Sequence, residues 1–155
     1  GWDFLDVDVE IVRAVRKSIV EIFAAEGEAH FRDLEHRTLA AALNRERVVL
    51  ALGGGALETA GNRNLLAKAP NTRLVYLEAP LDVLIARCEN QQRVQPDAPR
   101  RPVLERRNEL TTRFLDRQPL YESAHWTVHT AALDTDAIVR AIVTRTKENP
   151  ASLRP

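Results

Sequence analysis

The sequence is poor in sulfur, because its 155 residues include one cysteine, Cys88, and no methionine. A single cysteine cannot form an internal disulfide, which is usual in the reducing cytoplasm, so we expect a cytoplasmic protein. Cys88 is interpreted as a small apolar helix residue, since isolated cysteines are more often structural than reactive. The missing methionine and the first residue, Gly1, favour a trimmed chain or a fragment of a longer one.

The sequence also lacks an excess of either charge, with 22 basic and 22 acidic residues. Nucleic acids and anionic membrane surfaces attract strongly basic proteins, so we expect neither as a partner. No apolar run approaches the roughly 20 residues that span a bilayer, and no signal-peptide pattern opens the chain. There are no internal repeats, and we expect a monomer with one domain over residues 1–147 and a polar tail over 148–155.

The strongest strand signal is Val48–Leu52, five apolar residues between Arg47 and the glycines Gly53, Gly54 and Gly55. This composition predicts a parallel strand that is buried on both faces. The glycines then lie at the carboxyl end of the strand, where open α/β sheets bind ligands. Without Cβ atoms they can adopt positive φ and let a ligand approach the backbone closely. A plain glycine turn is the alternative interpretation.

Helical and strand patterns alternate along the rest of the chain. The sequence predicts strands over 4–7, 73–77 and 126–129, and helices over 9–15, 19–26, 28–43, 62–68, 80–90, 105–117 and 135–147. Ser18 and Glu21 form a capping-box pattern at the start of the second helix. This alternation indicates the α/β class, a parallel sheet flanked by helices.

Two pairs of charged residues are candidates for function. Asp6 and Asp8 end the first strand, where residues two apart point to the same side. Two such carboxylates can accept hydrogen bonds from hydroxyl groups or hold a hydrated cation, although a solvated strand end has the same pattern.

Arg32 and Glu35 are three residues apart on a helix and can pair, which would hold the arginine ready for a carboxylate. An ordinary surface ion pair is the alternative.

Residues 91–102 contain three prolines and three arginines, Arg93, Arg100 and Arg101. The segment is too polar for burial, and its prolines disfavour a helix, so it is predicted to be a mobile loop. It is either a solvated linker or a lid, over about 91–104, that brings arginine onto an anionic ligand.

Seven segments in a fixed order carry a further signal. They are residues 4–8, 18–23, 26–35, 53–55, 75–78, 101–104 and 117–121. The ordered set closely resembles the shikimate kinases, of the nucleoside-monophosphate-kinase-like P-loop family, over nearly the whole chain. The resemblance implies a phosphotransferase of aromatic amino-acid biosynthesis that phosphorylates the 3-hydroxyl of shikimate, with ATP and Mg²⁺ as cofactors.

The resemblance implies a role for each matching residue on the substrate side. Asp8 matches the carboxylate that takes the shikimate hydroxyl and can serve as base. Arg32 and Arg117 match the pair that grips the shikimate carboxylate. Gly53–Gly55 match the loop that contacts the ring hydroxyls. A small carboxylate with three hydroxyls suits such a site.

On the nucleotide side, Arg101 matches the catalytic lid arginine that reaches the transferring phosphate. Arg87 matches an arginine that lies against adenine, and Asp6 a residue near the magnesium shell. Phosphoryl transfer needs positioning and charge neutralisation more than covalent chemistry, so a mobile arginine fits this role. The lid before Arg101 looks long, and the segment from Arg101 to Arg117 looks short.

The sequence departs from the family in two places. Arg16 stands where the family has glycine, so we expect the first helix to end without its left-handed cap. No G-x-x-x-x-G-K-[ST] motif is present, although the family carries this motif on the central strand of a sheet ordered 2-3-1-4-5. We therefore expect that the chain as given does not turn over ATP.

The missing motif has a structural implication. Without the central strand, the sheet is expected to split or to collapse by pairing 48–52 with 73–77. Such a chain would be marginally stable or unfolded by itself, because unpaired strand groups and lost apolar burial are costly.

Three functional hypotheses follow. The first is a shikimate kinase whose P-loop was cut off, which we favour. The second is a non-catalytic, regulatory protein that keeps the shikimate pocket. The third is a related sugar-acid kinase of the gluconate type, against which Asp8, Arg32 and Arg117 argue together.

Overall fold

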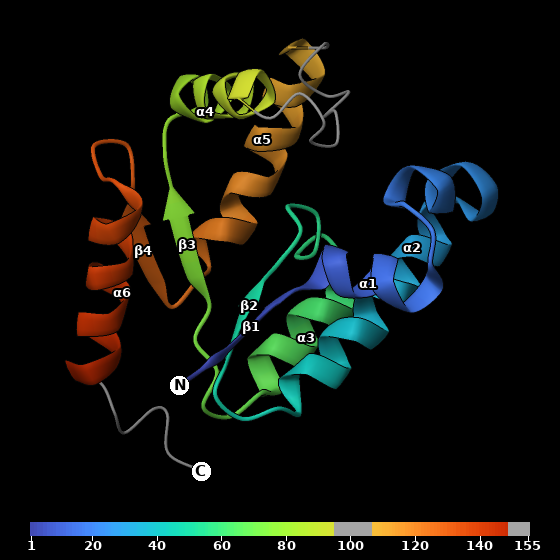
Figure 1. Cartoon of the computed structure of the whole chain (residues 1–155), viewed down its shortest axis with the longest axis horizontal. Coiled ribbons are helices and arrows are strands. Elements are labelled where there is room, and N and C mark those ends of the chain that lie inside the picture. The colour runs from blue at the N-terminus through green and yellow to red at the C-terminus, as the bar shows by residue number, and fades with distance from the viewer. Residues whose placement is uncertain (95–106, 149–155) are drawn as a thin grey trace. The chain divides into compact units, whose positions relative to one another are not determined.

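The computed structural model describes residues 1–94 and 107–148 (Figure 1). Its strands are β1 (Asp3–Asp6), β2 (Val48–Ala51), β3 (Val75–Glu78) and β4 (Trp126–His129). Its helices are α1 (Val7–Val15), α2 (Ile19–Leu43), α3 (Ala60–Lys68), α4 (Leu81–Val94), α5 (Arg107–Glu122) and α6 (Thr135–Glu148). The chain divides into two compact units, the first ending at Thr72 and the second beginning at Arg73.

The first unit is built on a parallel pair of strands, with Asp3 of β1 opposite Val48 of β2 and Asp6 opposite Ala51. Parallel neighbours need a crossover connection, which α1 and α2 supply. Helix α2 packs against both α1 and α3 (Figure 1). The core of this unit contains the buried apolar residues Val7, Ile11, Ile22 and Phe31.

The second unit contains the other parallel pair, in which Val75 of β3 lies opposite Trp126 of β4. Helix α6 packs against β4 (Figure 1). The ring of Tyr76 on β3 lies 5.4 Å from that of Tyr121 on α5, measured between centroids. Aromatic contact thus joins α5 to this sheet.

The observed sheets confirm the predicted fold class of parallel strands flanked by helices. Strands β2 and β3 belong to different two-stranded sheets, so they do not pair directly within the described residues. The prediction that the second strand is buried on both faces is wrong, because Val49 is 52 % exposed. Phe4 lies directly opposite Val49 and is 67 % exposed. These two apolar side chains of the first unit's sheet are therefore not buried in its core.

Helix ends in the first unit follow the sequence signals, with one exception. The Ser18–Glu21 capping box is confirmed, with Ser18 Oγ accepting from the Glu21 N–H at 3.2 Å. Gly27, at φ 81°, interrupts α2 as predicted. The expectation for Arg16 is wrong, because this residue adopts the left-handed conformation itself, at φ 56° and ψ 32°, and its N–H donates to the Val12 carbonyl. The cap is therefore kept without glycine.

Two helices of the second unit run further than predicted. Helix α4 continues to Val94, so residues 91–94 are helical rather than part of a loop, and the rest of the predicted lid lies outside the described residues. Helix α5 continues through Pro119, where a break was expected. Gln118 donates to the Glu122 carboxylate at 2.7 Å, and Tyr121 packs on Tyr76. These contacts support the last turn despite the missing proline N–H.

None of the described helices has a stretch long and apolar enough to cross a bilayer.

Candidate functional site

Asp8 lies in the first turn of α1, immediately after β1. Asp6 is the N-cap of this helix, and its Oδ1 accepts from the Asp8 N–H at 2.9 Å and the Val9 N–H at 3.2 Å. The prediction that Asp6 and Asp8 share one strand face is wrong, because the strand ends at Asp6. The two carboxylates nevertheless lie close enough for the charge of Asp6 to act on Asp8.

The electrostatic environment of Asp8 is unusual for an aspartate. Burial raises its pKa, the neighbouring Asp6 carboxylate raises it further, and the Arg32 guanidinium offsets part of the increase. Asp8 Oδ1 is buried and has no hydrogen-bond partner within residues 1–94 and 107–148. Leaving such an acceptor unsatisfied costs roughly 1–3 kcal/mol. This atom is therefore suited to accept a proton from the hydroxyl of a ligand.

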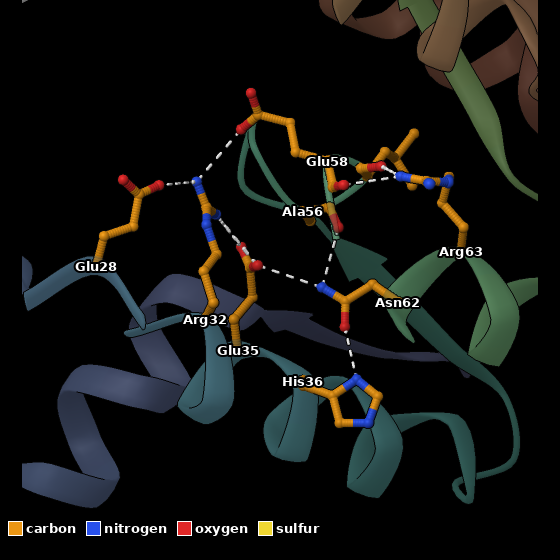
Figure 2. A network of polar contacts seen from close by, with 9 residues as sticks. Glu28, Arg32, Glu35, His36, Ala56, Glu58, Asn62 and Arg63 are labelled. Atoms are coloured by element: carbon orange, nitrogen blue, oxygen red, sulfur yellow. Dashed lines mark hydrogen bonds and ion pairs between the residues drawn. The ribbon is translucent and has the colours of Figure 1, made fainter. Parts of the chain in front are cut away.

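Arg32 lies at the centre of a cluster of carboxylates, shown in Figure 2. Its Nη1 donates to both carboxylate oxygens of Glu35, each at 3.2 Å. Its Nη2 donates to Glu28 at 3.1 Å and to Glu58 at 3.3 Å. The Glu35 side chain is 1 % exposed, whereas those of Glu28 and Glu58 are 65 % and 42 % exposed. The predicted Arg32–Glu35 pair is thus confirmed, and it is not an ordinary surface ion pair.

Glu35 is the buried member of this cluster. Burial raises its pKa, while the charge and hydrogen bonds of Arg32 favour the carboxylate form, and the nearby charge of Asp8 opposes it. A hydrogen bond from Asn62 also favours the carboxylate. A buried carboxylate needs such partners because its desolvation is costly.

The glycine loop after β2 brings Asp8 and Arg32 to one place. A Cβ atom at Gly53 would lie 3.0 Å from Asp8 Oδ1, and one at Gly55 would lie 2.5 Å from Arg32 Nη2. The expectation of positive φ is wrong here, since the positive-φ glycine of the described residues is Gly27. Glycine lets the Asp8 and Arg32 side chains lie this close to the loop backbone, since a Cβ atom would make either side chain shift.

Helix α3 holds the glycine loop through two side chains that the sequence analysis missed. Asn62 Nδ2 donates to the Ala56 carbonyl at 2.9 Å. Arg63 Nη1 donates to the Leu57 carbonyl at 2.6 Å and the Glu58 carbonyl at 2.8 Å (Figure 2). The sequence contained one indication of this role: Asn62 lies four residues before Leu66 and therefore on the same, buried side of the helix.

The remaining predicted residues belong to the second unit or lie outside the described residues. Arg87, on α4, donates to Thr130 Oγ1 at 2.9 Å and to the Thr130 carbonyl at 2.5 Å. Thr130 is buried, so the guanidinium fork joins α4 to the end of β4. Arg117 is half-buried on α5. Arg101 lies outside the described residues.

Metal-binding groups do not converge in the described part of the chain, where no set of three or more Asp, Glu, His or Cys side chains is placed to hold an ion. Mg²⁺ usually keeps several waters and binds through one or two carboxylates together with substrate phosphates. Asp6 and Asp8 lie close enough for their charges to interact, and one or two carboxylates are what this mode of binding takes from the protein.

Comparison with known proteins gives a consistent result. The family model described as shikimate kinase matches residues 1–147. A shikimate kinase of Salinibacter ruber is 40 % identical over 159 residues, which covers 96 % of this chain and 72 % of the relative. A shikimate kinase of Saccharopolyspora erythraea is 38 % identical, covering 99 % of this chain and 85 % of the relative.

Solved structures agree with these relatives. The crystal structure of shikimate kinase from Aquifex aeolicus has a TM-score of 0.79 at 29 % identity, covering 96 % of this chain and 83 % of that one. Shikimate kinase from Acinetobacter baumannii in complex with shikimate has a TM-score of 0.73 at 32 % identity, covering 99 % of this chain and 82 % of that one.

Proposed function

Because this chain belongs to the shikimate kinase family, we propose that its first unit holds shikimate and places the reacting hydroxyl on Asp8. Shikimate kinases are phosphotransferases that use ATP and Mg²⁺. The observation that supports this proposal best is the buried, unpartnered Oδ1 of Asp8 beside a glycine loop and a charged arginine. Asp8 Oδ1 accepts the hydroxyl proton, and its raised pKa favours this role as base.

Arg32 and Arg117 bind the carboxylate of shikimate in this proposal. The Nη1 of Arg32 is held by the buried Glu35, while its Nη2 is held by the exposed carboxylates of Glu28 and Glu58. A ligand carboxylate can therefore take the place of exposed partners while the buried one stays. The backbone of Gly53–Gly55, which lies against the Asp8 carboxylate at Gly53, contacts the ring hydroxyls of shikimate in this proposal.

Arg87, Arg101 and Asp6 belong to the nucleotide side of the proposal. When bound, ATP supplies the phosphoryl group and Mg²⁺ neutralises its charge. Arg87, which Thr130 holds in place, would contact adenine, and Arg101 would contact the transferring phosphate. Asp6 would hold a water of the magnesium shell.

We place this activity in a monomeric, cytoplasmic enzyme whose kinase domain is residues 1–147, with 148–155 as a polar tail. The extent of the family match supports the domain limits. The single cysteine supports the compartment, because disulfide-free proteins are usual in the reducing cytoplasm.

The test is steady-state kinetics of variants of the full gene product. Arg32→Ala and Arg117→Lys should each raise the shikimate KM by roughly 10- to 150-fold, since a charge-assisted hydrogen bond contributes roughly 1.5–3 kcal/mol. The ATP KM should stay unchanged. Arg37→Ala is the matched control, because Arg37 lies on the same helix and pairs with the exposed Asp33 at 2.6 Å. Unchanged shikimate kinetics in both variants would remove these assignments.

A further inference from the structure

Asn62 is a polar side chain that is fully buried, with 0 % of its surface exposed, and it is not among the residues proposed to contact shikimate or ATP. Its Nδ2 donates to Glu35 Oε2 at 3.2 Å and to the Ala56 carbonyl at 2.9 Å. Its Oδ1 lies 2.9 Å from His36 Nδ1. Figure 2 shows Asn62 between Glu35, Ala56 and His36. One amide thus joins three segments of the chain.

The orientation of this amide is fixed by its partners. If the amide were flipped, its oxygen would face a carboxylate and a carbonyl, neither of which can donate a hydrogen bond. The Nδ2 group must therefore point to Glu35 and Ala56, and Oδ1 must point to His36. His36 can then satisfy this oxygen only as a donor, with the proton on Nδ1.

We propose that Asn62 is a positioning residue that holds Arg32 and the glycine loop in one fixed arrangement, with His36 holding the Asn62 amide. Glu35 carries the restraint to Arg32, because both of its oxygens accept from Nη1. Ala56 carries it to the loop, because it directly follows Gly55. This inference rests on the proposed function, in which Arg32 binds the shikimate carboxylate.

The restraint matters because Arg32 and the loop are in close contact. A Cβ atom at Gly55 would lie only 2.5 Å from Arg32 Nη2, so the guanidinium occupies the space directly beside the loop backbone, and a shift of either segment changes where Arg32 meets a ligand. Misplacement of a binding group by about 1 Å can cost on the order of a hundredfold in activity. Without Asn62, Glu35 Oε2 and the Ala56 carbonyl would each lose a donor, and both segments would be free to shift.

The proposal predicts an effect that depends on the charge of the ligand. Methyl shikimate keeps the ring and hydroxyls of shikimate but has no carboxylate for Arg32. Asn62→Ala should weaken shikimate binding by at least about tenfold, the equivalent of one charge-assisted hydrogen bond. Binding of methyl shikimate should change little. Isothermal titration calorimetry of the full gene product, without nucleotide, measures both dissociation constants.

Two further variants separate positioning from a loss of fold. His36→Leu removes the donor to Asn62 Oδ1, whereas His36→Asn keeps an amide donor near the place of Nδ1. His36→Leu should weaken shikimate binding selectively, and His36→Asn should restore it toward the wild-type value. Asn64→Ala is the matched control for Asn62→Ala, because Asn64 is exposed on the same helix.

The outcomes distinguish this inference from the proposed function. If Arg32→Ala does not reduce the preference for shikimate over its methyl ester, the proposed role of Arg32 fails. If Arg32→Ala removes the preference but Asn62→Ala and His36→Leu keep it, only the inference about Asn62 is overturned. Equal weakening of both ligands by Asn62→Ala and His36→Leu would also overturn it, since that pattern indicates a general structural role. Selective weakening that disappears in the Arg32→Ala background supports it.

Discussion

Replacing Gly55 with alanine tests whether glycine is needed at this position for the space beside Arg32 rather than for its backbone conformation. The backbone of Gly55 has no positive φ, so alanine can adopt it without strain. The added Cβ atom would lie 2.5 Å from Arg32 Nη2, 2.8 Å from Nη1 and 2.7 Å from Glu58 Oε2. All three atoms are ends of flexible side chains and can move. The fold should therefore tolerate the substitution, while the position of Arg32 should not.

The size of the effect follows from the distances. Nη2 has to retreat by about 0.9 Å to reach the 3.4 Å of ordinary contact. The bonds from Nη1 to Glu35 are already 3.2 Å long, so a retreat of this size breaks or weakens them. Losing one such charge-assisted bond costs roughly 1.5–3 kcal/mol, or roughly a 10- to 150-fold rise in the shikimate KM.

The assay is the steady-state rate of the full gene product at varied shikimate and saturating ATP, together with thermal unfolding. Gly55→Ala should raise the shikimate KM in a protein that still unfolds cooperatively, with a lowered midpoint because buried Glu35 loses part of its contact with Arg32. Gly53→Ala is the companion variant, because its Cβ would approach Asp8 Oδ1 to 3.0 Å and should lower kcat instead. A Gly55→Ala enzyme with a wild-type KM would refute the reasoning, since Arg32 would then bind equally well from a displaced position.

Three other predictions follow from features of the first unit. Because burial and the Asp6 charge both raise the pKa of Asp8, the fall of kcat/KM with decreasing pH should occur above the usual aspartate pKa of about 3.9. Asp6→Asn, which keeps the N-cap, should move this fall to lower pH, and an unmoved profile would contradict the assignment of Asp8. Glu58→Gln should lower the shikimate KM, because it removes an exposed carboxylate that competes with the shikimate carboxylate for Arg32 Nη2. A raised KM would show that Glu58 does not compete with shikimate for Arg32. Arg16→Gly should raise the free energy of unfolding by about 1 kcal/mol in denaturant titrations, since a non-glycine residue in the left-handed conformation costs roughly 1–2 kcal/mol. A less stable Arg16→Gly variant would show that contacts of the arginine side chain offset this strain.

Local sequence patterns were sufficient for much of the fold and for the residues at the centre of the site. The alternation of helices and strands, the Ser18–Glu21 capping box and the interruption at Gly27 all depend on residues within one or two turns of each other. The Arg32–Glu35 pair is also local, with a separation of three residues. Such features can be predicted because both partners lie in the same short window of sequence.

Features that depend on distant residues could not be predicted in this way. Asn62 and Glu35 are 27 residues apart, and the sequence of α3 does not indicate that the Asn62 amide donates a hydrogen bond to a buried carboxylate. Pro119 was expected to end a helix, yet contacts such as that of Tyr121 with Tyr76 favour a continued one. The strand ends at Asp6, two residues before Asp8, so a small error in a boundary removed the basis for placing both carboxylates on one strand face.

The shared amide of Asn62 also has a consequence for the evolution of the sequence. A substitution at 62 that removes the acceptor leaves the His36 Nδ1–H group without its hydrogen-bond partner. A substitution at 36 that removes the donor leaves Asn62 Oδ1 buried and without a hydrogen bond. Either single change is therefore disfavoured while the other residue stays, and a paired replacement that again matches a donor to an acceptor is tolerated better. Among relatives of this chain, positions 36 and 62 should co-vary, although 26 residues separate them.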